Sequence, residues 1–480
     1  MNPTPYKYQT VIGLEVHLQL NTRTKAFCGC STDFGKAPNS NVCPVCLGFP
    51  GTLPVYNRGA LNSAIKLALA FGCQIQEHTK FDRKNYFYPD LPKNYQISQF
   101  DLPLSRNGYL DIYSQDKLKR IGITRVHLEE DAGKLIHETD VSLVDFNRTG
   151  IPLLEIVSEP DLNSPQEAFD YLTSLKSIIE YLDVSDCDME KGSLRCDANI
   201  SLRFPGAKEL GVKTELKNMN SFKGVKDALT FEAQRQTQLL EANQKMVQET
   251  RLWDIQKGVT VVMRTKEGAK DYRYFPDPDL TVFIIEQSMI SRIKALLPEL
   301  PQEKMRRFVK EYGLTEYDAK ILVSSKKDAE FAESCIQDYP GKDKKEMVNW
   351  LIGPLLSEAN LRKVKLHELS FDRNELINLI GFVQRQDISQ LCAKSVLSQL
   401  IDTAKSARDL IQEGNLGQVS NADALSEVIE TVIQENEKSV SDFKAGKANA
   451  LMYLVGQVMK KSSGKANPKV AGELIRGRLN

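Results

Sequence analysis

The clearest pattern near the start of the chain is a strict alternation of apolar and polar residues in VIGLEVHLQL, residues 11–20. This period is typical of a half-buried β-strand, and it places Glu15 and His17 together on the polar face. The stretch GSLRCDANISL, residues 192–202, alternates in the same way and places Arg195 and Asp197 on a polar face. Such a face either meets water or lines a polar site, and the pattern alone leaves both interpretations open.

Helical periodicity is rare before residue 297 and dominant after it. One early helix is expected at about 57–71, and a second begins at the capping box formed by Ser164 and Glu167, with Pro165 in its first turn. After LPELPQEK, residues 297–304, helical patterns follow almost without strands. Strands followed by helices predict an α+β fold. We expect three domains, with bounds 1–297, 298–407 and 408–480.

Four of the nine cysteines cluster within residues 28–46, as Cys-X-Cys, twelve intervening residues and Cys-X-X-Cys. Two close pairs joined by a loop rich in Gly, Pro and Asn can bring four thiolates to one tetrahedral zinc ion. The alternative is four small core residues, but the other five cysteines are scattered along the chain. The sequence therefore predicts a structural zinc knuckle, with all four ligand positions filled by Cys28, Cys30, Cys43 and Cys46.

An acidic residue interrupts the apolar run TGIPLLEIVSEP, in which residues 151–157 are expected to form a buried strand around Glu155. A buried carboxylate without a partner costs several kcal/mol, so Glu155 is expected to have a partner or a metal ion. Together with Glu15, Glu130, Asp197 and the imidazole of His17, it would offer a donor set that suits Mg²⁺ or Mn²⁺ better than zinc. Solvated polar faces remain the competing explanation for these residues.

The charge of the chain, its distribution and the cysteine count limit which binding partners and which cellular compartment we expect. Lys plus Arg and Asp plus Glu are equal at 63 each, so contact with nucleic acid must come from local patches. Residues 401–440 carry three basic and eight acidic side chains, whereas 441–480 carry eight basic and two acidic ones. A small basic helical module of this kind either docks on phosphates or is a solvated face. The sequence shows no P-loop, signal peptide or membrane span, and its odd cysteine count favours the reducing cytoplasm.

Several motifs together resemble one family over essentially the whole chain. They are FDRKNYFYPDLPKNYQISQFDLPL, HLEEDAGK, NRTGIPLLEIVSEPD, GSLRCDANIS, ELKNMNSF, the PELPQEK junction and the final GKANPK. These resemble the GatB family, which provides the B subunit of the bacterial glutamyl/aspartyl-tRNA amidotransferases. The sequence departs from the family pattern at KNYQ, where Gly commonly follows the Lys. The four cysteines are intact here, although they are not universal in the family.

The resemblance implies a cradle-shaped catalytic domain, an all-α helical domain and a small YqeY-like tail that binds tRNA. It also implies a ligase that corrects misacylated Glu-tRNA(Gln), Asp-tRNA(Asn) or both. ATP phosphorylates the side-chain carboxylate of the misacylated residue, and ammonia then displaces the phosphate to give the amide. The ammonia comes through a tunnel from a separate amidase (glutaminase) subunit, and a third, small subunit makes the complex a heterotrimer. The present chain has no motif for a glutaminase nucleophile, which is consistent with this division of labour.

The resemblance also assigns roles to individual residues. His17, Glu130 and Glu155 would be the principal Mg²⁺ ligands, while Glu15 and Asp197 would bind a second cation or steer ammonia. A further set of residues would contact phosphate or the tRNA end: Lys84, Tyr86, Lys93, Ser193 and Arg195. For Tyr86, simple packing is an equal alternative.

Two other functions remain to be weighed. A metal-dependent phosphohydrolase could use the same carboxylates and would turn over ATP without tRNA. A zinc-bearing scaffold that only binds tRNA would tolerate Glu155→Gln, yet it leaves a glutamate inside an apolar strand unexplained.

Overall fold

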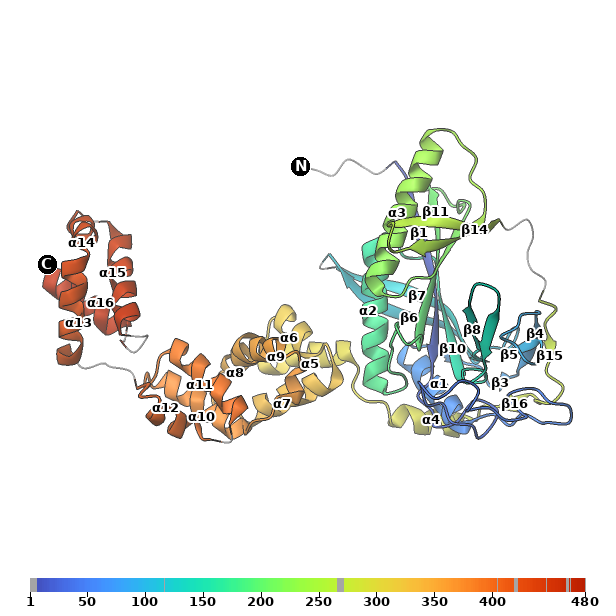
Figure 1. The fold of residues 1–480 in the computed structure, drawn as a ribbon, viewed down its shortest axis with the longest axis horizontal. Coiled ribbons are helices and arrows are strands. Elements are labelled where there is room, and N and C mark those ends of the chain that lie inside the picture. Colours follow the sequence, from blue (N-terminus) through green and yellow to red (C-terminus); the bar gives the residue numbers. More distant parts are fainter. Residues whose placement is uncertain are drawn as a thin grey trace. The chain divides into compact units, whose positions relative to one another are not determined.

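The structure is a computed structural model that describes residues 7–115, 117–265, 272–403, 405–417, 422–445, 447–462, 466 and 468–479. The chain forms two compact units, Met1–Pro301 and Gln302–Asn480 (Figure 1). A further division of the second unit at 407/408 stays a prediction. No helix in the described part of the chain is long and apolar enough to cross a membrane.

A nine-stranded sheet forms the centre of the first unit, in the order β14-β13-β12-β11-β1-β10-β7-β6-β2. Neighbouring strands are antiparallel except for the parallel pair β12 and β13, so the sheet is mixed. Its strands are β1 (Gln9–Gln19), β2 (Gln74–Ile75), β6 (Ser105–Ser114), β7 (Lys117–Glu130), β10 (Pro152–Ser158), β11 (Leu194–Arg203), β12 (Thr214–Lys217), β13 (Glu249–Asp254) and β14 (Val259–Thr265).

Three small sheets accompany the large one, in the orders β15-β4-β5, β16-β3 and β8-β9. Their strands are β3 (His78–Thr79), β4 (Asp82–Asn85), β5 (Tyr95–Ser98), β8 (Lys134–His137), β9 (Ser142–Asp145), β15 (Phe275–Pro276) and β16 (Phe283–Ile284). In the pairing of β15 with β4, Phe275 lies opposite Arg83 and Pro276 lies opposite Asp82. Two segments that are far apart in the sequence therefore lie side by side.

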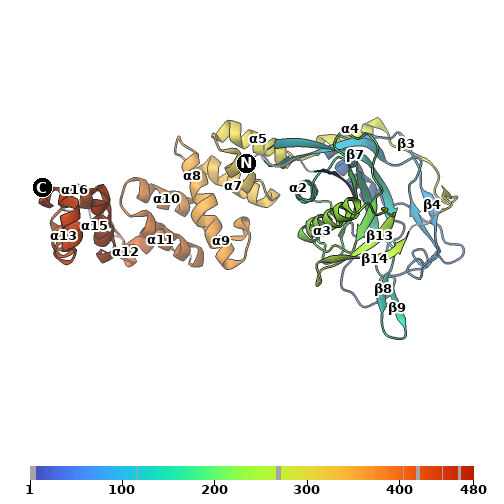
Figure 2. The ribbon, with the colours of Figure 1, turned by 90° about the horizontal axis from the view of Figure 1, so that it is seen from above.

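Helices cover one face of the large sheet, because the alternating strands turn their apolar side chains to that face. On β1, Ile12, Leu14, Val16 and Leu18 are fully buried in a core that they share with α1 (Arg58–Ala70), α2 (Pro165–Leu182) and α3 (Phe222–Glu241). Figure 2 shows α2 and α3 side by side on this face. The short helix α4 (Gln287–Ala295) packs against α1. The opposite face of the sheet is left to the polar side chains.

The N-terminus of α2 confirms the capping pattern expected from sequence, with one difference. The Ser164 hydroxyl accepts a hydrogen bond from the backbone N–H of Glu167 at 3.1 Å, as a helix N-cap does. The Glu167 carboxylate accepts from the backbone N–H of Asn163 at 2.7 Å, one residue before the cap, and also pairs with Lys119 on β7.

The second unit is helical throughout its described residues, so the predicted α+β fold followed by helices is confirmed. Its helices are α5 (Pro301–Tyr312), α6 (Glu316–Leu322), α7 (Lys326–Asp338), α8 (Lys345–Trp350), α9 (Leu356–Arg362), α10 (Arg373–Gln384), α11 (Gln390–Asp402), α12 (Ala407–Glu413), α13 (Ala422–Glu435), α14 (Glu437–Lys444), α15 (Ala448–Lys461) and α16 (Pro468–Leu479). A π-helical turn (Leu351–Leu355) and a 3-10 turn (Leu366–Glu368) flank α9.

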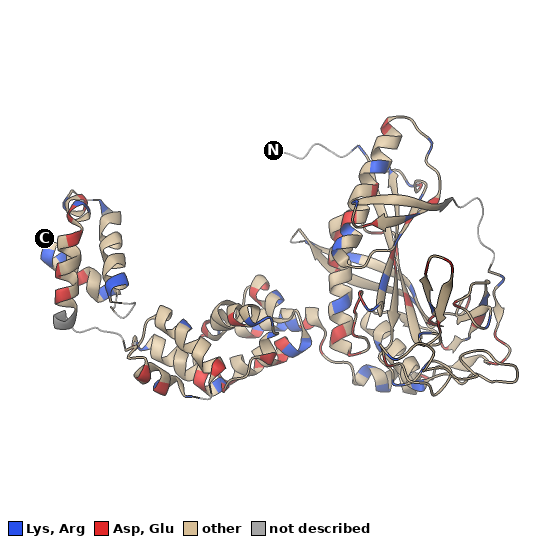
Figure 3. Ribbon diagram, viewed as in Figure 1, with Lys and Arg blue, Asp and Glu red and all other residues tan. Residues whose placement is uncertain are grey.

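The last four helices have an apolar core of their own, in which Leu425, Ile429 and Val432 of α13 pack with Leu454 of α15 and Ile475 of α16. Acidic side chains lie along α13, whereas basic side chains lie at the end of α15 and along α16 (Figure 3). The acidic and basic halves of the tail, which the sequence separates near residue 440, therefore lie mainly on different helices. One Gly-Lys-Ala-Asn repeat begins at residue 446 and the other at residue 464, and these two residues lie outside the described part of the chain.

Candidate functional site

Polar side chains from neighbouring strands of the large sheet line one cavity of about 940 Å³ on the face that the helices leave open. Cross-strand register brings them together, because directly opposed residues point to the same face. His17 on β1 lies opposite Glu155 on β10 and Arg195 on β11, and Glu155 in turn lies opposite His127 on β7. The acidic and basic residues of the lining are Glu15, His17, Lys84, Arg125, His127, Glu129, Asp131, Glu155, Arg195, Asp197, Lys213, Glu215 and Lys217.

Three side chains form the tightest group in this cavity. The Nε2 atom of His17 lies 3.5 Å from Oε1 of Glu129 and 3.4 Å from Oε2 of Glu155. One ligand atom from each of the three residues lies within 4.8 Å of the others. The Nε2 atom of His127 lies 3.5 Å from Oε2 of Glu155. Two carboxylates and an imidazole at these distances suit a hard divalent cation such as Mg²⁺ or Mn²⁺.

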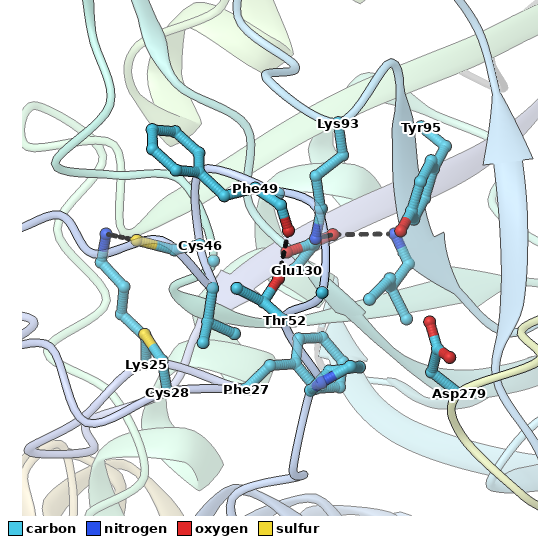
Figure 4. A pocket seen from close by; sticks show the side chains of 16 residues that line it. Lys25, Phe27, Cys28, Cys46, Phe49, Thr52, Lys93, Tyr95, Glu130 and Asp279 are labelled. Atoms are coloured by element: carbon cyan, nitrogen blue, oxygen red, sulfur yellow. Dashed lines mark hydrogen bonds and ion pairs between the residues drawn. The ribbon is translucent and has the colours of Figure 1, made fainter.

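The structure separates one member of the predicted trio from the other two, because Glu130 does not face His17 and Glu155. Glu130 follows Val126 and Leu128 in the β7 alternation and therefore points to the buried side of the strand. Its carboxylate pairs with Lys93 and accepts a hydrogen bond from the backbone N–H of Ile97 at 3.0 Å (Figure 4). The neighbouring residue, Glu129, occupies the place that the sequence analysis gave to Glu130.

Opposing electrostatic effects set the protonation of the group. Burial favours neutral His17, but the hydrogen bond to Glu155 and the charges of Glu129 and Glu155 outweigh it and raise the pKa of His17. Burial also opposes ionisation of Glu155, yet the nearby His127 and His17 lower the pKa of its carboxyl. Burial raises the pKa of Glu129 and lowers that of His127 to about 4. These shifts belong to the metal-free group, and a bound cation would require the neutral form of the His17 imidazole.

Glu15 and Asp197 line the same cavity and lie directly opposite each other on β1 and β11. The Glu15 carboxylate accepts a hydrogen bond from the Asn199 side chain at 2.9 Å, and Asp197 pairs with Lys217. The tight group of His17, Glu129 and Glu155 does not include them.

The five residues predicted to contact phosphate or the tRNA end divide into two sets. Lys84, Tyr86 and Arg195 line the cavity. Lys93 is instead paired with Glu130, and the Ser193 hydroxyl bonds the loop between α2 and β11, where it accepts from the Asp188 backbone N–H at 2.9 Å. Neither Lys93 nor Ser193 lines the cavity.

The cavity also contains aromatic residues that the sequence analysis missed, namely Phe100, Tyr272 and Tyr274, and they lie near the predicted cations Lys84 and Arg195. The rings of Phe100 and Tyr274 stack with their centroids 4.4 Å apart, and Lys84 lies with its Nζ atom 5.0 Å from the centroid of Tyr272. The Nη2 atom of Arg195 binds Asp131 at 2.8 Å, while its buried Nε atom has no hydrogen-bond partner among the described residues. Tyr272 and Tyr274 reach the cavity because the chain around them pairs with β4 and Asn85, so no local pattern could have identified them.

His127 and Glu129 were also missed, although a sequence signal for them existed. In the stretch TRVHLEE, residues 124–130, Arg125, His127 and Glu129 alternate with apolar Val126 and Leu128. The period of two puts the first three on the same face as Glu155, since β7 and β10 are neighbours. The alternation of polar and apolar residues therefore predicts which side chains share the face of Glu155, whereas the family motif HLEEDAGK does not.

The four clustered cysteines form a second candidate metal centre. Their Sγ atoms all lie within 4.8 Å of one another, and all nine cysteines of the chain are free of disulfides. The backbone N–H of Cys43 donates a hydrogen bond to Sγ of Cys46 at 3.1 Å. Four thiol donors at this spacing fit a tetrahedral zinc ion and leave no open coordination position.

Comparison with known proteins gives a consistent result over the whole chain. Residues 10–291 match the family model described as the GatB/GatE catalytic domain, and residues 330–479 match the one described as the GatB domain. The chain is 52% identical over 475 residues to the B subunit of aspartyl/glutamyl-tRNA(Asn/Gln) amidotransferase from Thermoanaerobacter sp. (strain X514), and the match covers 99% of this chain and 100% of the relative. The proteins of the same name from Carboxydothermus hydrogenoformans and Brevibacillus brevis are 50% and 49% identical, and each match covers at least 98% of this chain and 99% of the relative.

Proposed function

This chain belongs to the GatB family, and from that premise we propose that it is the component of a tRNA-dependent amidotransferase that activates misacylated tRNA. The substrates are Glu-tRNA(Gln), Asp-tRNA(Asn) or both. The side-chain carboxylate of the misacylated residue attacks the γ-phosphate of ATP and releases ADP. Ammonia then attacks the acyl phosphate, and phosphate leaves as the amide forms.

The single observation that carries this proposal is the buried group of His17, Glu129 and Glu155 in the large cavity. Attack of one anion on another requires positive charge between them. These three residues would hold a divalent cation, which screens the phosphate oxygens and aligns the displacement when it is bound. This trio replaces the one with Glu130 that the sequence analysis proposed. Glu130 keeps a structural role as the partner of Lys93.

The cations of the cavity would complete the phosphate site. Lys84 is held beside the rings of Tyr86 and Tyr272 and lies near the charges of Glu129 and Glu155, which raise its pKa despite its burial. It therefore stays charged and is suited to contact the transferred phosphoryl group. Arg195 is fixed by Asp131, and its Nε donor, which has no partner among the described residues, is available to an oxyanion.

Glu15 and Asp197 would serve the second half of the reaction. They lie across β1 and β11 from each other, beside His17 and Arg195 in the register. A carboxylate there can accept a proton from ammonium and so deliver the neutral nucleophile, or can bind a second cation. Asp197 is held by Lys217, so Glu15 is the better proton acceptor of the two.

The proposed partners follow from the division of labour that the family resemblance implies. We propose that an amidase (glutaminase) subunit supplies ammonia and that a further small subunit makes the assembly a cytoplasmic heterotrimer. The basic helices α15 and α16 would bind the phosphate backbone of tRNA. The four cysteines would bind zinc as a structural ion, away from the reaction.

The test is amidation by the reconstituted heterotrimer with ATP and misacylated tRNA. The ammonia source is either glutamine or ammonium chloride, because the second bypasses the amidase. We expect wild-type protein to form Gln-tRNA(Gln) or Asn-tRNA(Asn) from both sources, and Glu155→Gln to form it from neither. Amidation by Glu155→Gln at the wild-type rate would favour a scaffold without chemistry of its own.

A further inference from the structure

Lys25 is almost fully buried, with only 1% of its surface exposed, and it lies beside the four-cysteine centre. Its Nζ atom is 3.7 Å from Sγ of Cys46 (Figure 4). The same atom is 3.3 Å from the backbone carbonyl oxygen of Phe146. No carboxylate of the described residues forms an ion pair with Lys25 within 4.0 Å. A buried ammonium group without a compensating anion costs several kcal/mol. The sulfur of Cys46 is therefore the group in contact that can supply negative charge.

Lys25 is closely packed against its surroundings. The backbone N–H of Ala26 donates to the carbonyl oxygen of Gly150 at 2.7 Å, which fixes the chain next to Lys25. Gly150 has a φ of +81°, and a Cβ atom there would lie 3.6 Å from both Cδ of Lys25 and Cβ of Cys46. The lysine stem and the cysteine are thus packed against the same turn, and the ammonium group has little freedom to leave the sulfur.

The centre formed by a divalent cation and four thiolates has a net charge of −2. Such a charge is unfavourable where water is excluded. A positive hydrogen-bond donor to one sulfur removes part of that charge, and charge-assisted hydrogen bonds are about twice as strong as neutral ones. Such partners of metal ligands typically change metal affinity by about 10–100-fold when they are removed.

We propose that Lys25 is the internal counter-cation of the metal centre formed by the four cysteines. Its ammonium group donates a hydrogen bond to the metal-bound sulfur of Cys46 and slows loss of the metal. The same group donates to Phe146, so it also ties the cysteine loop to the turn at residues 146–150, which leads into β10 and Glu155. This inference rests on the proposed zinc centre, whose failure is a separate outcome below.

The experiment compares zinc release from the full-length chain with its partner subunits, using wild type, Lys25→Met and Lys25→Gln. Zinc content is measured by elemental analysis, and the release rate is measured with a chromogenic chelator. Lys80→Met is the matched control, because Lys80 is also largely buried but is paired with Asp82 and Asp101. We expect about tenfold faster release in both Lys25 variants and no change in the control.

The outcomes separate the two claims. A wild-type chain that folds without zinc would overturn the metal centre and the role of Lys25 together. Zinc that is bound by wild type and released at the same rate from folded Lys25→Met would overturn the role of Lys25 alone. Lys25→Gln retains a donor for the Phe146 carbonyl, so it carries the same test if Lys25→Met does not fold. Cobalt substitution gives a second readout, because loss of the hydrogen bond should shift the sulfur-to-cobalt charge-transfer band in both Lys25 variants.

Discussion

The placement of two adjacent glutamates shows how a single step along a strand changes function. Glu129 and Glu130 end β7, and successive side chains of a strand point to opposite faces. Glu129 therefore lies 3.5 Å from His17, whereas Glu130 pairs with Lys93 on the other side. The alternation of the sequence indicates these opposite directions, whereas the motif resemblance grouped Glu130 with His17 and Glu155.

The two residues should respond differently to the same substitution. Glu129→Gln should weaken Mn²⁺ binding to the purified chain by at least about tenfold, because it removes a charged ligand. Glu130→Gln should leave Mn²⁺ affinity unchanged but lower the free energy of unfolding by about 3 kcal/mol, because Lys93 loses its buried partner. Isothermal titration with Mn²⁺ and urea denaturation measure the two quantities. The reverse pattern, with Mn²⁺ binding lost only in Glu130→Gln, would contradict the site described here.

His127 gives the metal-free protein a stability that depends on pH. Its pKa is lowered to about 4 by burial, while an unfolded chain protonates the imidazole near pH 6.5. Between these values the unfolded state binds a proton that the folded state excludes, so stability falls as the pH is lowered. The slope from this residue is at most about 1.4 kcal/mol per pH unit.

The measurement is urea denaturation in EDTA between pH 4.5 and 6.5, with His127→Gln as the comparison. We expect a shallower pH dependence in the variant than in wild type. Glu129 acts in the opposite direction, because its raised pKa makes the folded state bind more protons near pH 5. The difference between the two proteins therefore reports on His127, and equal slopes would argue against a neutral buried imidazole.

At the scale of single elements, local sequence patterns correctly predict a strand or helix whose position depends on its own residue spacing and capping. The strand at residues 11–20, the helix at about 57–71 and the helix that begins at Ser164 all follow from spacing and capping. Order within the sheet could not be predicted in this way, because β1 pairs with β10 and β11, which lie more than 130 residues further along the chain. The same reason hid the aromatic side of the cavity, which depends on the pairing of β15 with β4.

The cap of α2 offers a test of an element predicted from sequence. Ser164→Ala should lower the stability of the first unit by about 1 kcal/mol, since the N–H of Glu167 loses its acceptor. The chain has two tryptophans, Trp253 on β13 and Trp350 on α8, so a Trp350→Phe background lets fluorescence follow the first unit alone. Ser164→Thr keeps the acceptor and should restore most of the loss. An unchanged midpoint in Ser164→Ala would mean that the cap does not stabilise this helix.

At the scale of the whole molecule, the sequence separated a strand-rich region from a helical one, and the structure divides the chain after Pro301. What the sequence could not supply was the reason for the polar strand faces, because a solvated face and a cavity wall have the same period. Cross-strand register resolves this, since it gathers His17, Glu129 and Glu155 from three strands at one point. The site is thus a property of the assembled sheet.

The last four helices should contribute tRNA affinity without affecting the catalytic group. Their apolar core is their own, so removal of residues 418–480 should leave the first unit folded. We expect the truncated protein to bind tRNA at least about tenfold more weakly, with a weaker dependence on salt, because it loses basic side chains that meet phosphates. Filter binding at several salt concentrations measures this, and unchanged Mn²⁺ binding serves as the control. Wild-type tRNA affinity in the truncated protein would reject the proposed role of the tail.

The central claim is that the group of His17, Glu129 and Glu155 supports transfer of the γ-phosphoryl group of ATP to the side-chain carboxylate of a misacylated tRNA. The most direct measurement is phosphate release from ATP by the heterotrimer, with glutamine and ammonium withheld. The reaction is run with Glu-tRNA(Gln), with Asp-tRNA(Asn) and with the same tRNAs uncharged, for wild type and for Glu155→Gln. We predict release that requires a misacylated tRNA and that falls to background in Glu155→Gln. Release that is indifferent to tRNA, or that persists in Glu155→Gln, would contradict the claim.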